Sequence, residues 1–322
     1  MNFFTTKKMT AIVTATVLST TLLAGCGDNT ATDQNNETNN QQQAEQGTEK
    51  KITHVWGDTT LQETPTKIAA LDFSFVDELT ALGVSPVATA GAGKTEVPEY
   101  LADQVKDYTY VGERKEPNLE VLTSAAPDLI IANPDRHSMI KNELSGIAPT
   151  IALDDRSYEE VLKNTDLLAE VLGKQEQATA VKKELETKIN DAKSKITTKP
   201  TVLVVGAFED EFTVWVKDSF IGSLLTAINT DYVYNGDAQS TEGKAEVAKM
   251  TVEKLAETNP DYLFVYGDLS LWKDNPLFKN LKATQDNHVL EVDRNLWSRG
   301  RGPIAAKLII EEAVPFMSGE SK

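Results

Sequence analysis

A short sequence pattern occurs twice in this chain, and it restricts the fold more than any other feature. The first copy, at 118–132, reads N-L-E-V-L-T-S-A-A-P-D-L-I-I-A, and the second, at 251–266, reads T-V-E-K-L-A-E-T-N-P-D-Y-L-F-V-Y. In the first copy Asn118 can cap a short helix, Pro127 ends it, and an apolar run typical of a buried parallel strand follows. Because the same unit is used twice, the sequence predicts two similar α/β lobes with a cleft between them.

The segment between the two copies is suited to a long helix. Tyr158 to Leu172 is amphipathic, Gly173 interrupts it, and Ala178 to Ile196 contains neither proline nor glycine. At about 1.5 Å per residue the second stretch is about 28 Å long, enough to connect two lobes as a stiff strut. We therefore predict an α/β fold of two Rossmann-like lobes joined by one long helix. The expected boundaries are an N-terminal lobe at 51–172, a linking helix at 173–199 and a C-terminal lobe at 200–322.

Shorter elements follow from local patterns of apolar and turn residues. We expect a hairpin over 52–61 with Gly57-Asp58 at its turn. We expect strands at 68–71, 84–88, 150–153, 202–205 and 289–292, and helices at 76–82, 223–227 and 304–316. Asp72-Phe73-Ser74 is expected to be the loop after the first of these strands. The glycine-rich loop at 91–94 lacks the full phosphate-binding pattern, so we interpret it as a plain flexible loop.

The N-terminus has the features of a targeting segment. Lys7 and Lys8 precede an apolar stretch at 11–23, and Leu23-Ala24-Gly25-Cys26 matches the bacterial lipobox. This match implies cleavage after residue 25 and acylation of Cys26, with about 0.8 kcal/mol of membrane affinity per buried methylene. The alternative is an ordinary signal peptide with an incidental cysteine. Residues 26–50 are rich in Asn, Gln, Thr and Glu, which predicts a disordered tether.

Bulk composition excludes several classes of protein and site. The net charge of −17 over 322 residues argues against a general nucleic-acid binder. A lone cysteine excludes an internal disulfide, and the three histidines lack the spacing of metal ligands. We therefore expect no cofactor and no direct protein ligand to a metal. The absence of a G-x-S-x-G elbow and of a zinc motif argues against an enzyme. A surface hydrolase and a structural lipoprotein remain distant alternatives.

Four arginines are candidates for binding an anionic ligand in the cleft. Arg136, Arg299 and Arg301 follow predicted strands or precede predicted helices, and Arg114 is a weaker fourth candidate. Guanidinium groups bind carboxylates through two parallel hydrogen bonds and stay charged at any working pH. Each arginine taken alone could equally be a solvated or salt-bridged surface residue.

Other side chains could complete the site or serve the fold. Trp215 and Trp297 are candidate cleft walls, although tryptophan is more often simply part of the core. His137 could hydrogen-bond a ligand or have a structural role, and Ser74 is a further candidate ligand contact. Glu120 and Glu253 begin the two equivalent helices. Each suits the helix dipole, but a symmetric pair also favours a shared function.

The repeated pattern, joined to a lipobox, resembles the substrate-binding proteins of bacterial iron-siderophore and vitamin B12 importers. The resemblance spans about residues 65–316 and implies a class III periplasmic-binding-protein fold with a helical connection between the lobes. It also implies that Glu120 and Glu253 dock on an ABC permease that works with an ATPase. The implied location is the extracytoplasmic face of a Gram-positive cell membrane, held there by the lipid anchor.

Within that group, Pro134-Asp135-Arg136-His137 and the stretch at 296–302, L-W-S-R-G-R-G, look like the ferric citrate binders. This resemblance implies that arginines hold the citrate carboxylates while citrate holds the iron. Iron would then be bound only as part of a chelate. A catecholate siderophore is the nearest alternative ligand, because arginines also serve that anion.

Overall fold

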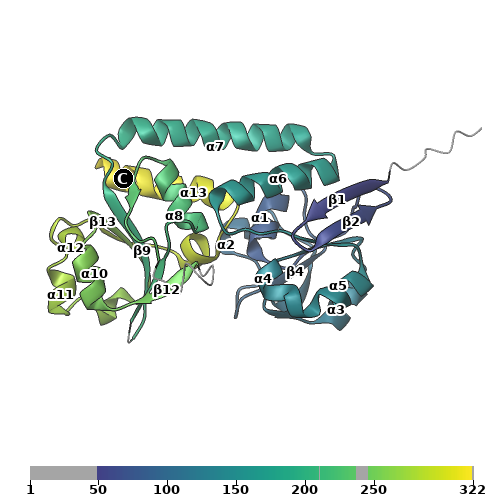
Figure 1. Ribbon diagram of the computed structural model, residues 1–322, viewed down its shortest axis with the longest axis horizontal. Helices are drawn as coiled ribbons and strands as arrows, with labels where there is room; N and C mark the ends of the chain where they lie inside the picture. The colour runs from purple at the N-terminus through teal and green to yellow at the C-terminus, as the bar shows by residue number, and fades with distance from the viewer. Residues whose placement is uncertain (1–48, 210, 237–245, 321–322) are drawn as a thin grey trace, which may run out of the picture. The chain divides into compact units, whose positions relative to one another are not determined.

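The computed structural model describes residues 49–209, 211–236 and 246–320 (Figure 1). The predicted signal peptide, the lipidation site Cys26 and nearly all of the predicted tether lie outside these residues. None of the helices in the described part of the chain is both long enough and apolar enough to cross a membrane.

The hairpin predicted near the start of the folded region is present. Strand β1 (Lys50–His54) pairs antiparallel with β2 (Gly57–Leu61), and His54 is the partner of Gly57. The turn therefore lies at residues 55–56, and the prediction that placed Gly57-Asp58 at the turn is wrong. Gly57 has a φ of 118°, a conformation open to glycine, and it begins the second strand. Because Lys50 belongs to β1, the predicted tether extends one residue into this strand.

The N-terminal lobe contains a six-stranded sheet of order β6-β5-β4-β3-β7-β8. Its strands are β3 (Ile68–Ala70), β4 (Ala88–Gly91), β5 (Thr109–Glu113), β6 (Glu116–Pro117), β7 (Leu129–Ala132) and β8 (Thr150–Ala152). All neighbouring pairs are parallel except β5 with β6. Every residue of β3, β4, β7 and β8 is buried, which explains their short apolar runs.

Two sequence predictions in this lobe are displaced from the observed elements. Strand β4 begins at Ala88, not at Val84, because the N–H of Val84 bonds back to Leu79 at the end of a helix and Pro86 has no N–H to donate. Asp72 is not in a loop that extends to Ser74. It caps helix α1 (Phe73–Ala81) by accepting the N–H of Phe73.

Helices cover this sheet and lead into the second lobe. They are α1, α2 (Glu99–Ala102), α3 (Leu119–Ser124), α4 (Pro134–His137), α5 (Lys141–Ile147) and α6 (Tyr158–Leu172), with a 3₁₀ turn, η1 (Ser138–Ile140). Helix α6 has the predicted bounds. Its N-terminus carries a capping box between Ser157 and Glu160, and it ends at Gly173 in the left-handed conformation.

The C-terminal lobe has a second six-stranded sheet of order β12-β10-β9-β13-β14, with β11 paired to β9. Its strands are β9 (Thr201–Ala207), β10 (Phe212–Trp215), β11 (Asp231–Tyr232), β12 (Val247–Met250), β13 (Tyr262–Gly267) and β14 (Val289–Glu291). Its helices are α8 (Phe220–Ala227), α10 (Val252–Thr258), α11 (Pro276–Lys279), α12 (Lys282–Gln285) and α13 (Pro303–Ser318). A 3₁₀ turn, η2 (Leu269–Leu271), follows β13, and one π-helical turn, η3 (Asn295–Arg299), precedes α13. The predicted class, two α/β lobes, is confirmed.

The repeated sequence pattern forms the same structure in both lobes. Helix α3 leads into β7, and α10 leads into β13. The aspartate of each Pro-Asp pair accepts hydrogen bonds from a threonine near the start of the neighbouring strand. Asp128 accepts the backbone and hydroxyl donors of Thr66, and Asp261 accepts the same two donors of Thr201, at 2.7–3.0 Å. In both lobes the pattern therefore fixes one strand against the next.

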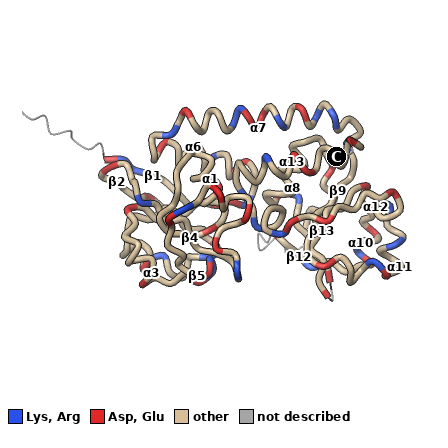
Figure 2. Tube along the Cα trace, turned by 180° about the vertical axis from the view of Figure 1, so that it is seen from behind, with Lys and Arg blue, Asp and Glu red and all other residues tan. Residues whose placement is uncertain are grey.

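The linking helix α7 (Gln175–Lys195) packs on the cores of both lobes. Its buried residues Ala178, Leu185 and Ala192 recur every seven positions, a narrow apolar stripe. Ala178 belongs to the N-terminal core, whereas Leu185 and Ala192 belong to the C-terminal core. Lysines and acids follow one another along the length of α7 (Figure 2).

Candidate functional site

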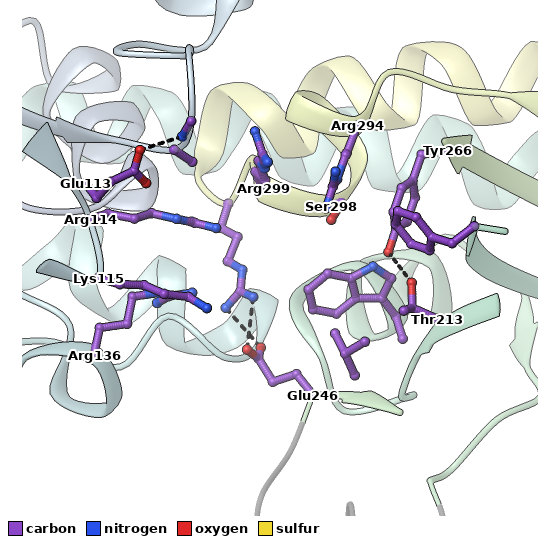
Figure 3. Close-up of a pocket in the computed structure, with 16 residues that line it drawn as sticks. Glu113, Arg114, Lys115, Arg136, Thr213, Glu246, Tyr266, Arg294, Ser298 and Arg299 are labelled. Atoms are coloured by element: carbon purple, nitrogen blue, oxygen red, sulfur yellow. Dashed lines mark hydrogen bonds and ion pairs between the residues drawn. The ribbon is translucent and has the colours of Figure 1, made fainter. Parts of the chain in front are cut away.

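A cavity of about 630 Å³ lies where the carboxyl ends of the strands of both sheets meet (Figure 3). Ligands of open α/β sheets bind beyond these strand ends, and the volume is within the roughly 300–1,000 Å³ of small-molecule sites. Six lining side chains are cationic: Arg114, Lys115, Arg136, Arg294, Arg299 and Arg301. The others are Ala92, Gly93, Glu113, Phe208, Thr213, Trp215, Glu246, Val247, Tyr266 and Ser298.

On the N-terminal side, one buried carboxylate joins two arginines. Arg114 follows β5 and Arg136 lies in α4, and each places an Nη1 atom 2.9 Å from a different oxygen of Asp72. Burial acts to raise the pKa of Asp72, but the guanidinium groups of Arg136, Arg114 and Arg301 outweigh burial and lower the pKa to about 2. Asp72 is therefore ionised at any working pH.

His137 fixes the backbone around these arginines. Its Nδ1 accepts the N–H of Asn133 at 2.9 Å, so its Nε2 carries the proton and donates to the carbonyl of Arg114 at 2.7 Å. The ring is fully buried, and burial lowers its pKa, which keeps it neutral. His137 is not among the lining residues. It ties α4 to the turn that carries Arg114.

On the C-terminal side, aromatic rings hold an exposed arginine. The guanidinium carbon of Arg294 lies 5.4 Å from the ring centre of Phe208 and 6.0 Å from that of Tyr266. Tyr266 is fixed in turn by a 3.0 Å hydrogen bond to Thr213. Arg294 keeps its N–H groups available, because aromatic faces orient it without neutralising it.

Arg299 and Arg301 have different surroundings although they are two residues apart. Arg299 donates to the side-chain carbonyl of Asn295 at 2.9 Å, and its pKa is lowered by burial and then by the like charges of Arg294 and Arg114. Arg301 is only 5% exposed and pairs with Asp155 at 3.2 Å and with Glu246 at 2.9 Å.

The ion pairs of Arg301 with Asp155 and Glu246 indicate a structural role for this arginine. Burial acts to lower its pKa, but the carboxylates of Glu246, Asp155 and Asp72 outweigh burial and raise the pKa above its usual value. Its guanidinium also lies 5.3 Å from the ring centre of Trp215. Asp155 follows β8 of the N-terminal lobe and Glu246 precedes β12 of the C-terminal lobe. Arg301 therefore joins the two lobes through buried ion pairs.

The cavity wall is positive although the chain as a whole is acidic. Six cationic and two acidic lining side chains give it a formal net charge of +4. Among the described residues, Lys115, Arg294 and Arg299 have no carboxylate within ion-pair distance. Such a wall is suited to a ligand that carries several negative charges.

The structure brings most of the predicted ligand residues to this cavity. Arg114, Arg136, Arg299, Arg301 and Trp215 all line it. The indole N–H of Trp215 has no hydrogen-bond partner among the described residues.

Three predicted ligand residues do not line the cavity. Trp297 is 1% exposed, stacks on Phe264 and donates its indole N–H to Glu312 at 2.6 Å, so it is a core residue. Ser74 is fully buried in the first turn of α1, and His137 lies behind the arginines.

The two glutamates predicted to dock on a permease lie in equivalent places. Glu120 is in the first turn of α3 and Glu253 is in the first turn of α10, and both side chains are exposed. Neither lines the cavity.

Several residues of the site were not selected from the sequence. Lys115 and Arg294 lie in the same stretches as Arg114 and Arg299, so their charge and position are the signal that could have identified them. Asp72, Asp155 and Glu246 carried no such signal, because their partners are distant in sequence. Within residues 49–320, gaps excepted, no group of three or more His, Cys, Asp and Glu side chains is placed to hold a metal ion.

Comparison with known proteins extends these observations. The family model described as "Periplasmic binding protein" matches residues 68–296. The chain is 33% identical, over 92% of each sequence, to the Fe(3+)-citrate-binding protein YfmC of Bacillus subtilis (strain 168). It is 30% identical to the putative ABC transporter substrate-binding lipoprotein YhfQ of the same organism, over 98% of this chain and 100% of that one.

Solved structures share the fold. The crystal structure of Staphylococcus aureus SirA complexed with staphyloferrin B matches with a TM-score of 0.73 at 24% identity, covering 85% of this chain and 99% of SirA. The resemblance noted from the repeated pattern agrees with these matches. The matched region covers most of both lobes, without the β1-β2 hairpin and α13. It includes Arg114, Arg136 and Arg294, whereas Arg299 and Arg301 follow it by a few residues. The chain therefore belongs to the periplasmic binding protein family.

Proposed function

We propose that this protein is the substrate-binding component of an ABC importer and captures a ferric chelate rich in carboxylates, with ferric citrate as the first candidate. The observation that carries this proposal is the set of cations in one cavity that lack a carboxylate partner among the described residues: Lys115, Arg294 and Arg299. The relatives named above support a role in transport, not catalysis.

The chemistry of the cavity suits a chelate better than a free metal ion. In this proposal the iron is cargo, enclosed by its own organic ligand, and the protein contacts the outer carboxylate oxygens. Arginine binds such oxygens with charge-assisted hydrogen bonds and never loses its charge at working pH. A positive wall would repel free Fe(III) but attract its citrate complex, whose net charge is negative.

A catecholate siderophore is the second candidate, because the cavity has an aromatic side. Phe208, Trp215 and Tyr266 line it. Figure 3 shows Tyr266 across the cavity from Arg114 and Arg136. Aromatic faces could stack on catechol rings, whereas citrate has no ring to stack.

Titration of the purified protein separates the two candidates. Ferric citrate should change the fluorescence of Trp215 in a saturable way at micromolar concentration. The ferric complex of 2,3-dihydroxybenzoate should compete only weakly. The absence of a saturable response to ferric citrate, with tight binding of the catecholate complex, would transfer the proposal to the second candidate. The absence of any response to either complex would refute it.

Delivery would follow from the remaining predicted features. In our proposal a lipid on Cys26 anchors the protein on the extracytoplasmic face of the cell membrane, and Glu120 and Glu253 present one carboxylate per lobe to the permease. The two glutamates suit this role because they are exposed and occupy equivalent positions. Mass spectrometry of the protein from iron-limited cells would test the lipid and would identify the cargo together.

A further inference from the structure

We propose that Asp72 is a positioning residue: a carboxylate built into the anion site that aligns Arg114 and Arg136 so that both point their free N–H groups at the ligand. This inference rests on the proposed function, because it concerns the same cavity. It contradicts a simple charge argument, which would treat any buried carboxylate beside an anion site as unfavourable for binding.

The geometry of Asp72 supports a positioning role. The side chain is 1% exposed and is not among the cavity-lining residues, so it lies behind the arginines. Its Oδ1 accepts a 2.9 Å hydrogen bond from Nη1 of Arg114. Its Oδ2 lies 2.9 Å from Nη1 of Arg136 in an ion pair whose N–H is not aligned with the oxygen. One carboxylate thus draws together two like charges that would otherwise repel each other.

The arginines keep most of their binding capacity in this arrangement. A guanidinium has five N–H donors, and each arginine directs a single nitrogen at Asp72. Their side chains remain 15% and 19% exposed, and both line the cavity. The guanidinium of Arg114 also lies 5.3 Å from the ring centre of Phe73, the residue after Asp72.

Fixing these side chains before the ligand arrives removes part of the cost of binding. Two long, flexible side chains would otherwise lose their rotamer freedom when the ligand binds, and this loss weakens affinity. His137 fixes the main chain of Arg114 while Asp72 fixes its guanidinium. Burial and the hydrogen bond to Phe73 in turn restrain Asp72. The cavity is therefore pre-organised on its N-terminal side.

A pair of variants with the same change in charge tests this inference. Asp72→Asn removes one negative charge and the carboxylate that joins the arginines. Asparagine caps helices as well as aspartate does, so α1 should form normally. Glu113→Gln also removes one negative charge from the site, but within the described part of the chain Glu113 forms no ion pair with an arginine. It accepts the N–H of Gly93, and the amide oxygen of glutamine can do the same.

The two variants should change affinity for ferric citrate in opposite directions. Glu113→Gln should bind a few-fold more tightly, because a repelling charge is gone. Asp72→Asn should bind at least tenfold more weakly, although it is equally more positive. Binding by Asp72→Asn that equals or exceeds that of the wild type would overturn the inference. Thermal unfolding of both variants verifies that each is folded.

A second readout does not need the chelate. Nitrogen NMR of the arginine side chains should show hindered rotation of the Arg114 and Arg136 guanidinium groups in the wild type and in Glu113→Gln. In Asp72→Asn this hindrance should be lost. If the wild type binds neither ferric citrate nor the ferric 2,3-dihydroxybenzoate complex, the proposed function fails. The NMR comparison then decides the role of Asp72 alone, and unchanged arginine signals in Asp72→Asn would refute it.

Discussion

The cationic side chains of the cavity differ in how their charge is compensated. Arg301 pairs with the buried Asp155 and the partly buried Glu246, and Arg114 and Arg136 share one buried carboxylate. Arg299 donates to the neutral side chain of Asn295, and the like charges of Arg294 and Arg114 act on it more strongly than the carboxylates of Glu113 and Asp293. A side chain that is already fully paired has little left to offer a ligand. Position in one cavity therefore does not imply one role, and we expect Arg301 to serve the fold and Arg299 to serve binding.

Replacement of the two neighbouring arginines by alanine should separate these roles. Arg301→Ala removes the cationic partner of the buried Asp155 and of the partly buried Glu246. This should lower the free energy of unfolding by about 3–5 kcal/mol. Arg299→Ala removes no ion pair that the described residues form, so the free energy of unfolding should change by less than about 1 kcal/mol. Its affinity for ferric citrate should fall about tenfold or more, as expected when a hydrogen bond to a charged group is lost.

Urea denaturation and ferric citrate titration of both variants provide the measurements. Equal losses of stability would show that Arg301 is not a structural residue.

At the scale of single elements, the linking helix α7 is attached to both lobes. Lys182 pairs with Asp166 of α6, and Lys188 pairs with Glu311 of α13. These pairs are largely exposed and contribute little. The buried stripe of α7 contributes more, and Leu185 is its one large fully buried side chain, at 2% exposure.

Leu185→Ala should therefore weaken the attachment of α7 to the C-terminal core. We expect the free energy of unfolding to fall by about 2–5 kcal/mol, because the change leaves a cavity under the helix. Circular dichroism during denaturation should still show one transition. Val181→Ala, at a partly buried position beside the stripe, is the matched control and should cost less. A loss below that of Val181→Ala would contradict the packing described here.

The same elements show what can be read from a sequence. The helix over 158–172 and the repeated helix–strand unit were predictable because their patterns are periodic and local. Strand β4 begins later than the sequence predicts. The N–H of Val84 bonds to Leu79 at the end of α1, and Pro86 has no N–H to donate to a strand. No local pattern reveals that Trp297 is a core residue, because its burial depends on Phe264 and Glu312, which are distant in sequence.

For the site, residue type was predictable and pairing was not. Arginines that follow strand ends indicated an anion-binding cavity, since parallel strand ends converge. Which arginines are neutralised depends on Asp72, Asp155 and Glu246, which come from three separate segments. Only the folded chain brings these carboxylates to the guanidinium groups.

At the scale of the described molecule, the lobes are joined by buried polar contacts. Asp77 of α1 caps helix α13, which has no side-chain cap from its own N-cap residue. The two carboxyl oxygens of Asp77 accept the N–H groups of Ile304 and Ala305 at 2.8 and 2.9 Å. Position 302 must be glycine, because a Cβ there would collide with the Asp77 carboxyl group. Ser223 of α8 accepts the N–H of Tyr158 at the start of α6.

This cap should make stability depend on pH. Burial raises the pKa of Asp77 to about 7, although the two N–H groups of α13 act to lower it. The unfolded carboxyl titrates near pH 3.9, so the folded state binds one more proton between about pH 4 and 7. The contribution of Asp77 to stability is thus fully present below about pH 4 and is lost as pH rises through 7. Burial also raises the pKa of Glu78, so this residue makes stability fall with pH in the same direction. Burial raises the pKa of the nearby Tyr100 as well, so its hydroxyl stays neutral.

Asp77→Asn should flatten the pH dependence. Its free energy of unfolding should be lower than that of the wild type at pH 5, because one N–H of α13 loses its acceptor, and the difference should shrink toward pH 8. Urea denaturation at intervals between pH 4.5 and 8 measures both slopes. Identical slopes for wild type and variant would show that Asp77 does not titrate in this range.

Docking on a permease is a prediction for the whole protein. Glu120→Ala combined with Glu253→Ala should abolish uptake of iron from ferric citrate in cells, while the purified variant keeps the affinity of the wild type. Both side chains are exposed and outside the cavity, so neither the fold nor the site should change. Glu257→Ala, also exposed on α10, is the control. Loss of chelate affinity in the double variant would assign the glutamates to the site or the fold.

The cap on α13 also limits how this protein can be recombined with its relatives. A chimera that takes one lobe from another family member would pair α13 with a foreign α1, and its first turn would lose the carboxylate of Asp77 unless the donor supplies one there. Transplants of specificity should therefore exchange α1, α13 and Gly302 together and keep the crossover points away from all three.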